Sequence, residues 1–153
     1  AVLFPESQER IAAEAARADL SPEGAGAGFD ALPETRAHFD EAMRLYPPAY
    51  LVVRMARKAD TLPGPGTRVE EGALISMAPW VLHRHRTLWT DPERFDPSRF
   101  RPGAPPPDRF AYMPFGAGPR ICVGARFALA EGVIVLARLL REFRLEFAGD
   151  PMV

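Results

Sequence analysis

The chain has 153 residues, of which 47% are hydrophobic and 25% are charged, values typical of one globular domain. Its net charge of −1 gives no reason to expect a nucleic-acid partner. The longest apolar run, residues 133–137, is far shorter than the ~20 residues that cross a bilayer, and the first residues do not resemble a signal peptide.

The first part of the chain predicts two helices. Residues 5–18 begin with proline and are rich in strong helix formers. Residues 20–28 are rich in glycine and predict a loop. Residues 33–45 also begin with proline, and this second helix should end before Pro47 and Pro48, which cannot continue it.

The middle of the chain predicts strands and irregular structure. Residues 49–56 and 73–80 are rich in β-branched and aromatic residues, and the residues between them favour turns. We therefore expect a small sheet in this region. Residues 91–109 are interrupted repeatedly by proline and predict an irregular segment, a kind of segment that is often functional.

A third helix is predicted from about Gly124 to Phe143, and residues 143–147 could begin a final strand. The apolar stripe of this helix consists of Phe127, Ala130, Ile134, Ala137 and Leu140. The expected fold class is α+β, mainly helical, with a small sheet between the second helix and the segment that holds the only cysteine.

Cys122 is the only cysteine, so no internal disulfide can form. A lone cysteine is ordinarily a small buried hydrophobe. Here, however, Gly116, Gly118 and Pro119 form a tight turn before it, and the third helix follows directly. Glycine permits close approach of the backbone to a flat ligand, and a helix N-terminus favours the thiolate, which is the form that binds metals.

A protein-only zinc site does not fit these residues. The three histidines, His38, His83 and His85, are not at metal-ligand spacing from Cys122. Haem fits a single cysteine better, because the porphyrin supplies the four equatorial ligands and Cys-ligated haem is a known arrangement.

Residues 115–124, FGAGPRICVG, resemble the haem-binding signature F-x-x-G-x-R-x-C-x-G of the cytochrome P450 family. The resemblance implies that Cys122 binds the iron of haem b, that Arg120 pairs with a haem propionate and that Phe115 packs beside the sulfur. It also implies that backbone N–H groups after the cysteine donate to the sulfur. The cofactor-binding residues expected from this segment are Phe115, Gly116, Gly118, Arg120, Cys122, Val123 and Gly124.

Glu41 and Arg44 resemble the E-x-x-R motif of the same family, followed by its prolines. In isolation they would be an ordinary surface pair. In the family, an arginine from a downstream P-x-R-F motif completes a structural triad that serves folding and haem retention. Arg99 of Pro97–Phe100 is the expected third member, although Arg94 lies in a near-duplicate motif.

The family resemblance extends to the strand after the prolines. It implies that Leu51, Val52 and Val53 line an apolar substrate pocket and that Arg54 meets a propionate. An ordinary strand with a polar end is the alternative. His83 occupies a position that reaches a propionate in some members, and a surface histidine is the alternative there.

The resemblance covers nearly the whole chain and implies that residues 1–153 are the C-terminal haem-binding portion of a cytochrome P450 domain. The acidic residue and threonine of the family's long I helix, which deliver protons to dioxygen, do not occur in these residues. We therefore expect that a missing N-terminal portion of the P450 domain, which carries these residues, is a partner of this chain. Without it, the chain should be unstable, bind haem loosely or associate through its exposed apolar surface.

The implied function is a haem-thiolate monooxygenase, an oxidoreductase that hydroxylates a small apolar substrate. Its electrons would come from a ferredoxin or a flavin reductase on the proximal face near Cys122. Arg120 and Arg126 could meet such a donor or be internal. A non-catalytic haem-binding fragment and a redox-sensing thiol on an unrelated fold are the alternatives. A soluble, cytoplasmic and bacterial protein is expected. Arginine is abundant and Lys58 is the only lysine, which we interpret, with the abundant alanine, proline and glycine, as coding bias and not as a binding surface.

Overall fold

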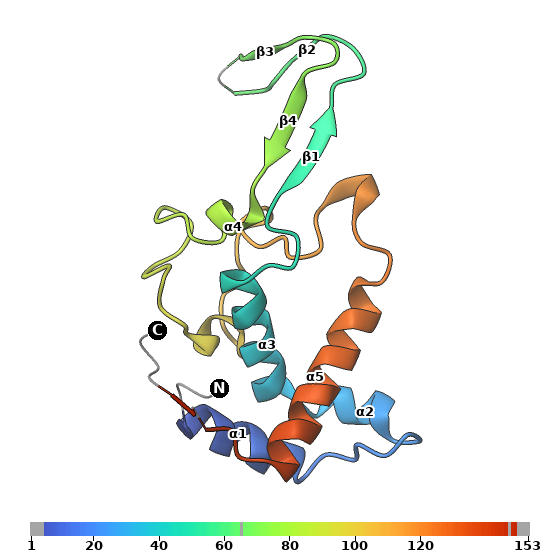
Figure 1. Cartoon of the computed structure of the whole chain (residues 1–153), viewed down its shortest axis with the longest axis vertical. Coiled ribbons are helices and arrows are strands. Elements are labelled where there is room, and N and C mark those ends of the chain that lie inside the picture. The colour runs from blue at the N-terminus through green and yellow to red at the C-terminus, as the bar shows by residue number, and fades with distance from the viewer. Residues whose placement is uncertain (1–4, 65, 147, 150–153) are drawn as a thin grey trace. The chain divides into compact units, whose positions relative to one another are not determined.

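A computed structural model describes residues 5–64, 66–146 and 148–149 of the chain (Figure 1). The chain divides into two compact units. The first, called the helical unit, comprises Ala1–Ala42, Phe95–Pro106 and Cys122–Val153. The second, called the hairpin unit, comprises Met43–Arg94 and Pro107–Ile121. Each unit is described by itself below.

The helical unit contains α1 (Pro5–Ala15), α2 (Ala25–Asp30), α5 (Ala125–Glu142) and most of α3 (Pro33–Leu45). The last three residues of α3 belong to the hairpin unit. The predicted bounds of the second helix are confirmed, and those of the third differ by one residue at each end. The first helix ends three residues earlier than expected. The predicted loop at 20–28 is wrong in part, because the glycine-rich residues from Ala25 form α2.

The N-terminus of α3 is capped from α1 by the Glu14 carboxylate. The backbone N–H groups of Glu34 and Thr35 donate to Glu14 at 2.7 and 2.8 Å, and the Thr35 hydroxyl donates to it at 2.7 Å. A carboxylate at this end of a helix satisfies N–H groups that have no partner within the helix and interacts favourably with the helix dipole. Glu14 therefore ties the first two long helices together.

The core of the helical unit forms where α5 packs on α1 and α2. Its buried cluster consists of Ala15, Leu20, Leu32, Val133 and Ala137. Leu140 is also buried, so two members of the predicted α5 stripe are confirmed. Phe127 is a wrong prediction, because its side chain is 71% exposed although it follows the same period.

The segment after α5 is not a strand over residues 143–146, and Phe147 lies outside the described residues. Leu145 instead exchanges two hydrogen bonds with one side chain of α1. The Gln8 amide donates to the Leu145 carbonyl at 2.9 Å, and the Leu145 N–H donates to the Gln8 amide oxygen at 2.9 Å. The side-chain amide of Gln8 thus makes the two hydrogen bonds to Leu145 that the backbone of a paired strand would make.

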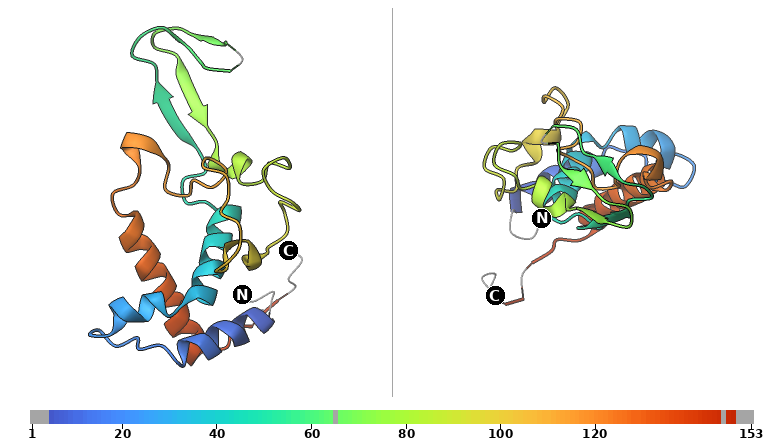
Figure 2. Two further views of the ribbon diagram at one scale, coloured as in Figure 1. Left: turned by 180° about the vertical axis from the view of Figure 1, so that it is seen from behind. Right: turned by 90° about the horizontal axis from the view of Figure 1, so that it is seen from above.

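The hairpin unit contains the expected small sheet. β1 (Val52–Met55) pairs antiparallel with β4 (Leu74–Met77), with Val53 opposite Ser76. A second ladder of β2 (Asp60–Thr61) and β3 (Arg68–Val69) lies at the tip of the same hairpin, within the stretch expected to be turns only (Figure 2). A short helix that was not predicted, α4 (Pro79–Leu82), follows β4.

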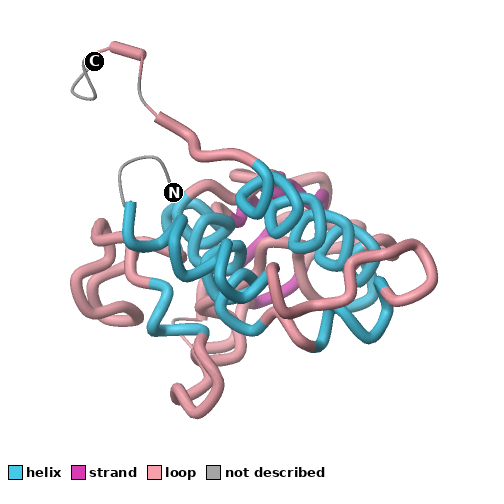
Figure 3. Tube along the Cα trace, turned by 90° about the horizontal axis from the view of Figure 1, so that it is seen from below, coloured by secondary structure: helices cyan, strands magenta, loops and turns pink. Residues whose placement is uncertain are grey.

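Loops make up most of the chain between α4 and α5 (Figure 3). The interruptions are two single 3-10 turns, η1 (Pro97–Phe100) and η2 (Gly118–Arg120). The predicted irregular segment at 91–109 is therefore confirmed apart from η1, and the α+β, mainly helical class is confirmed. Within the described residues, no helix combines the length and the apolar character needed to cross a membrane.

Candidate functional site

The cysteine loop, residues 115–124, joins the two units, with its first seven residues in the hairpin unit and its last three in the helical unit. In the hairpin unit, Gly116 and Gly118 have φ angles of +76° and +72°. Side chains other than glycine rarely adopt this conformation, so the sequence places glycine where the turn requires it. The Gly116 N–H donates to the Met113 carbonyl at 3.1 Å, which closes the first turn of the loop.

In the helical unit, Cys122 lies three residues before the first residue of α5. Its carbonyl accepts a hydrogen bond from the Ala125 N–H at 3.3 Å. The thiol is free and exposed, so the reading of Cys122 as a small buried hydrophobe is wrong. Val123, directly after it, is fully exposed at 104%, and Phe127 in the first turn of α5 is also exposed.

These features fit a haem. Apolar side chains near the thiol in the chain are open to solvent, and a porphyrin is a large apolar surface that would cover such groups. Among the described residues, no group of three or more His, Cys, Asp or Glu side chains could hold a metal ion by itself. A metal bound by Cys122 would therefore need further ligands of the kind that a porphyrin supplies.

The other predicted residues of the loop have different exposures. Arg120 ends η2 and is exposed, as is Arg126 in the first turn of α5. Both are therefore accessible to a propionate or a partner, and the reading of either as internal loses support. Phe115 and Gly124 are partly buried. Their roles toward a haem remain predictions.

Glu41 is completely buried and holds the irregular segment within the helical unit. Its carboxylate accepts a hydrogen bond from the Asp96 N–H at 2.8 Å, and Arg99 Nε lies 3.6 Å from the same oxygen. Arg94 is exposed, whereas the Arg99 side chain is only 15% exposed. The geometry therefore favours Arg99 over Arg94 as the partner of Glu41.

Arg44 is also completely buried, in the hairpin unit. Its guanidinium donates to the carbonyls of His83 and Pro92, both at 2.7 Å, and to that of Arg94 at 3.0 Å. It lies over the Trp89 ring, 5.1 Å from the centroid. One arginine thus organises the backbone of three loop residues, which the planar array of guanidinium donors makes possible.

His83 has no exposed surface and uses both ring nitrogens within the hairpin unit. Nδ1 lies 3.1 Å from the Arg44 carbonyl, and the Met113 N–H donates to Nε2 at 2.8 Å. The surface-histidine reading is therefore wrong. The propionate contact stays a prediction, and it would require one of these two bonds to be given up.

The strand residues expected to face a substrate are open in the hairpin unit. Leu51 and Val53 are 45% and 43% exposed, and Val52 is partly buried. Because side chains alternate along a strand, Val52 and Val53 point to opposite faces of β1, so the three cannot all line one surface. Arg54 is exposed and donates to the Val53 carbonyl, which leaves its other donors accessible.

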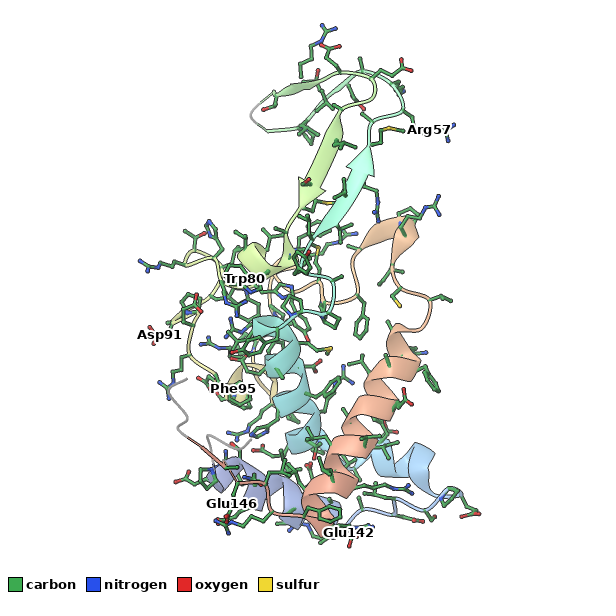
Figure 4. The ribbon with its side chains drawn as sticks, viewed as in Figure 1. Arg57, Trp80, Asp91, Phe95, Glu142 and Glu146 are labelled. Atoms are coloured by element: carbon green, nitrogen blue, oxygen red, sulfur yellow. The ribbon has the colours of Figure 1, made fainter. Side chains whose placement is uncertain are left out.

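A charged cluster in the helical unit was not predicted. Glu34 accepts hydrogen bonds from Arg101 at 2.6 and 2.7 Å and from Arg10 at 2.8 Å, and these arginines hold the pKa of Glu34 below its ordinary value. His38 lies one turn along α3, with its ring 6.0 Å from that of Phe95. Phe95 is labelled in Figure 4. Burial lowers the pKa of His38, whose Nε2 has no hydrogen-bond partner among the described residues.

Comparison with known proteins identifies the family of the chain. The family model of cytochrome P450 matches residues 4–152. The chain is 46% identical over 112 residues to cytochrome P450 4B1 of Rattus norvegicus, covering 72% of the chain and 21% of that protein. It is 36% identical over 140 residues to cytochrome P450 97B2, chloroplastic, of Glycine max, covering 72% of the chain and 24% of the relative.

A third relative, thromboxane-A synthase of Sus scrofa, is 38% identical over 124 residues, covering 80% of the chain and 23% of the relative. The chain therefore spans less than a quarter of the length of these relatives. The three come from mammals and a plant, so a bacterial origin gains no support. The match to the family model also rules out a thiol on an unrelated fold.

Proposed function

Since the chain belongs to the cytochrome P450 family, we propose that the whole protein is a haem-thiolate monooxygenase and that these residues form the C-terminal haem-binding portion of its domain. The observation that carries the proposal is the free, exposed Cys122 thiol between a turn that requires glycine and the start of α5. This is the arrangement in which a single thiolate can meet a flat metal-bearing ligand.

The residues of the cysteine loop would bind and orient the cofactor. Cys122 would donate its thiolate sulfur to the iron, and the N–H groups that follow it would donate to that sulfur. Arg120, exposed at the end of η2, would neutralise a propionate, and exposed Arg54 is a second candidate for that contact. Bound haem would supply the oxygen-activating iron, and a thiolate ligand favours O–O cleavage.

Glu41, Arg44 and Arg99 would act on folding and haem retention rather than on the substrate. Their contacts run to the backbone and side chains of the segment between α4 and the cysteine loop. Two of the three have no exposed surface, which is incompatible with direct contact to a substrate in this arrangement. Buried charges of this kind specify one arrangement of the chain more than they add stability.

The proposed partners follow from the family. A ferredoxin or flavin reductase would deliver electrons near Cys122, where the exposed Arg120 and Arg126 could attract an acidic surface. The substrate would be a small apolar molecule, in keeping with exposed apolar Leu51 and Val53. The remainder of a P450 domain would supply the proton-delivering residues.

A second candidate is a haem-binding protein without monooxygenase activity. It rests on the same residues, since the exposed Cys122 and Arg120 bear on cofactor binding and not on turnover. Turnover of an apolar substrate with an electron donor separates this candidate from the first.

Haem titration tests the shared part of both candidates. The chain is mixed with haemin, and the absorption spectrum and bound fraction are measured beside those of Cys122→Ser. We expect a thiolate-type spectrum that Cys122→Ser loses, because no other cysteine can replace it. Identical spectra and affinities for the two chains would remove Cys122 from the iron site and end the proposal.

A further inference from the structure

A chain of hydrogen bonds runs through His83 from the end of α3 to the first turn of the cysteine loop, entirely within the hairpin unit. The ring joins the Arg44 carbonyl, at 3.1 Å from Nδ1, to the Met113 N–H, at 2.8 Å from Nε2. The carbonyl of the same Met113 accepts from the Gly116 N–H at 3.1 Å. We call this the His83 bridge.

The two partners dictate the protonation state of the ring. A carbonyl can only accept, so Nδ1 must carry a hydrogen, and an N–H can only donate, so Nε2 must be bare. The His83 bridge therefore requires the neutral Nδ1–H tautomer. A proton on Nε2 would place two donors face to face at 2.8 Å and break the bond to Met113.

The surroundings of the ring favour that neutral state. His83 has no exposed surface, and its ring packs 5.4 Å from that of Tyr112. The charged groups that act on it are Arg44 and Arg84, both cationic. Arg84 itself lies over the ring of Trp80, 4.2 Å from the centroid, and pairs with Glu93 at 3.2 Å. Trp80 is labelled in Figure 4. Burial is the largest cause that lowers the pKa of His83.

The backbone of His83 is held as well, because Arg44 Nη1 donates to the His83 carbonyl at 2.7 Å. A buried side chain held from two sides loses little further freedom when it binds a third group. This geometry suits His83 to set the position of a neighbouring backbone segment.

We propose that His83 is a positioning residue for the cysteine loop: its neutral ring holds the Met113 backbone and with it the turn to Gly116, and protonation of the ring releases them. The part of this proposal that concerns haem retention rests on the proposed function, because it requires that the cysteine loop binds haem. The bridge itself is a property of the chain that can be measured without haem.

Two variants separate the two hydrogen bonds of the His83 bridge, because each can retain only one of them. In His83→Gln, the amide oxygen can occupy the place of Nε2 and accept from Met113. In His83→Asn, the shorter amide can occupy the place of Nδ1 and donate to Arg44 while leaving Met113 without an acceptor. The two variants are both uncharged amides, so they differ mainly in which bond they retain.

The experiment measures the ring and the backbone separately. Nitrogen-15 NMR of the histidine side chains in the chain gives the tautomer of His83, and hydrogen exchange gives the protection factor of the Met113 amide as a function of pH. The Ala56 amide, which donates to the Ala73 carbonyl within the hairpin unit, reports unfolding of that unit, and the Ala137 amide reports unfolding of the helical unit. We expect the neutral Nδ1–H tautomer at pH 7 and loss of Met113 protection as the ring titrates, at a pH below 6.5.

Among the variants, His83→Asn should lower Met113 protection by roughly tenfold or more, while His83→Gln retains most of it. In chains loaded with haem, loss of haem to excess apomyoglobin should be faster in His83→Asn than in His83→Gln. An Nε2–H tautomer, a charged ring at pH 7, or equal Met113 protection at all pH values above global unfolding would overturn the proposal. The His83 tautomer and the pH dependence of Met113 protection are measured in the unaltered chain, so they test the proposal even if a variant fails to fold.

Failure of this proposal can be told from failure of the proposed function. If Met113 protection follows the His83 ring but Cys122→Ser leaves the haem spectrum unchanged, the bridge stands and the haem-thiolate proposal fails. If haem binds through Cys122 but Met113 protection does not change as the His83 ring titrates, only the His83 proposal fails.

Discussion

Arg44 and His83 hydrogen-bond each other's backbone carbonyl through their side chains. Arg44 Nη1 donates to the His83 carbonyl at 2.7 Å, and His83 Nδ1 lies 3.1 Å from the Arg44 carbonyl. Both side chains are completely buried. This reciprocal pair joins the end of α3 to the segment after α4, so residues 39 positions apart in the chain are held as one structural element.

Replacing Arg44 with lysine should therefore destabilise the chain although the charge is retained. A lysine ammonium is a point charge and cannot reproduce the guanidinium fork to three carbonyls. Leaving one or two buried acceptors without a donor should cost about 2–4 kcal/mol of unfolding free energy, measured by urea denaturation. Arg94→Lys is the matched control, because the Arg94 side chain is exposed, and it should change stability by less than about 0.5 kcal/mol. Equal effects of the two substitutions would refute this role.

The triad prediction can be tested at Glu41 and at its two possible partners. Glu41→Ala should yield chain without haem, because it leaves the Asp96 N–H and Arg99 without their buried acceptor. Arg99→Ala should also reduce haem content, whereas Arg94→Ala should not. Haem per chain is measured by absorbance after gel filtration. Normal haem content in Glu41→Ala would show that Glu41 forms only an ordinary ion pair and is not needed for haem retention.

The pH dependence of stability should show a step that begins near pH 6.5. His38 and His83 bind protons more weakly in the folded chain than in the unfolded one, because burial lowers both pKa values from 6.5. Their contribution is therefore complete above pH 6.5 and is lost as the pH falls from 6.5 through the lowered pKa values. Glu34 adds a separate loss below its ordinary pKa of 4.5, since its pKa is lowered as well.

Single substitutions can show which histidine causes this loss of stability at acidic pH. His38→Phe retains a ring beside Phe95 and removes the titrating group, so the fall in unfolding free energy between pH 7 and pH 5 should shrink. His85→Gln, at an exposed position, should leave the step unchanged. Thermal or urea unfolding at several pH values measures it. A step of the same size in all three chains would show that His38 does not contribute.

Gly132 in α5 should not tolerate alanine, despite the better helix propensity of alanine. A Cβ atom at this position would lie 2.3 Å from Phe39 Cζ and 2.6 Å from Cε2. The helix gain of about 1 kcal/mol should be outweighed by overpacking, for a net loss of about 1–2 kcal/mol. In a Phe39→Leu background the shorter side chain leaves room, and the same Gly132→Ala change should become stabilising. A gain in both backgrounds would contradict the contact.

Local sequence signals were enough to predict much of the fold. The bounds of α3 follow from Pro33 at one end and Pro47–Pro48 at the other, and β1 and β4 follow from their β-branched residues. The Glu14 cap could not be predicted, because it joins residues about twenty positions apart. Phe127 shows the same limit, since periodicity gives the apolar face of a helix but not how far neighbouring elements cover it.

The candidate site shows a similar division. Cys122 and its glycines were predicted from a dense local motif, and the positive φ angles of Gly116 and Gly118 agree with the close turn expected there. The choice between Arg94 and Arg99 depends on which arginine faces Glu41, which two similar motifs cannot reveal. The burial of His83 was missed for the same reason, because its partners Arg44 and Met113 lie 39 and 30 positions away.

The central claim is that Cys122 is the thiolate ligand of a haem, and the carbon monoxide difference spectrum of the reduced, haem-loaded chain tests it most directly. We predict the band typical of thiolate-ligated haem in the chain as it stands and its loss in Cys122→Ser, the variant without any thiol. A spectrum typical of histidine-ligated haem in the unaltered chain, unchanged by Cys122→Ser, would contradict the account.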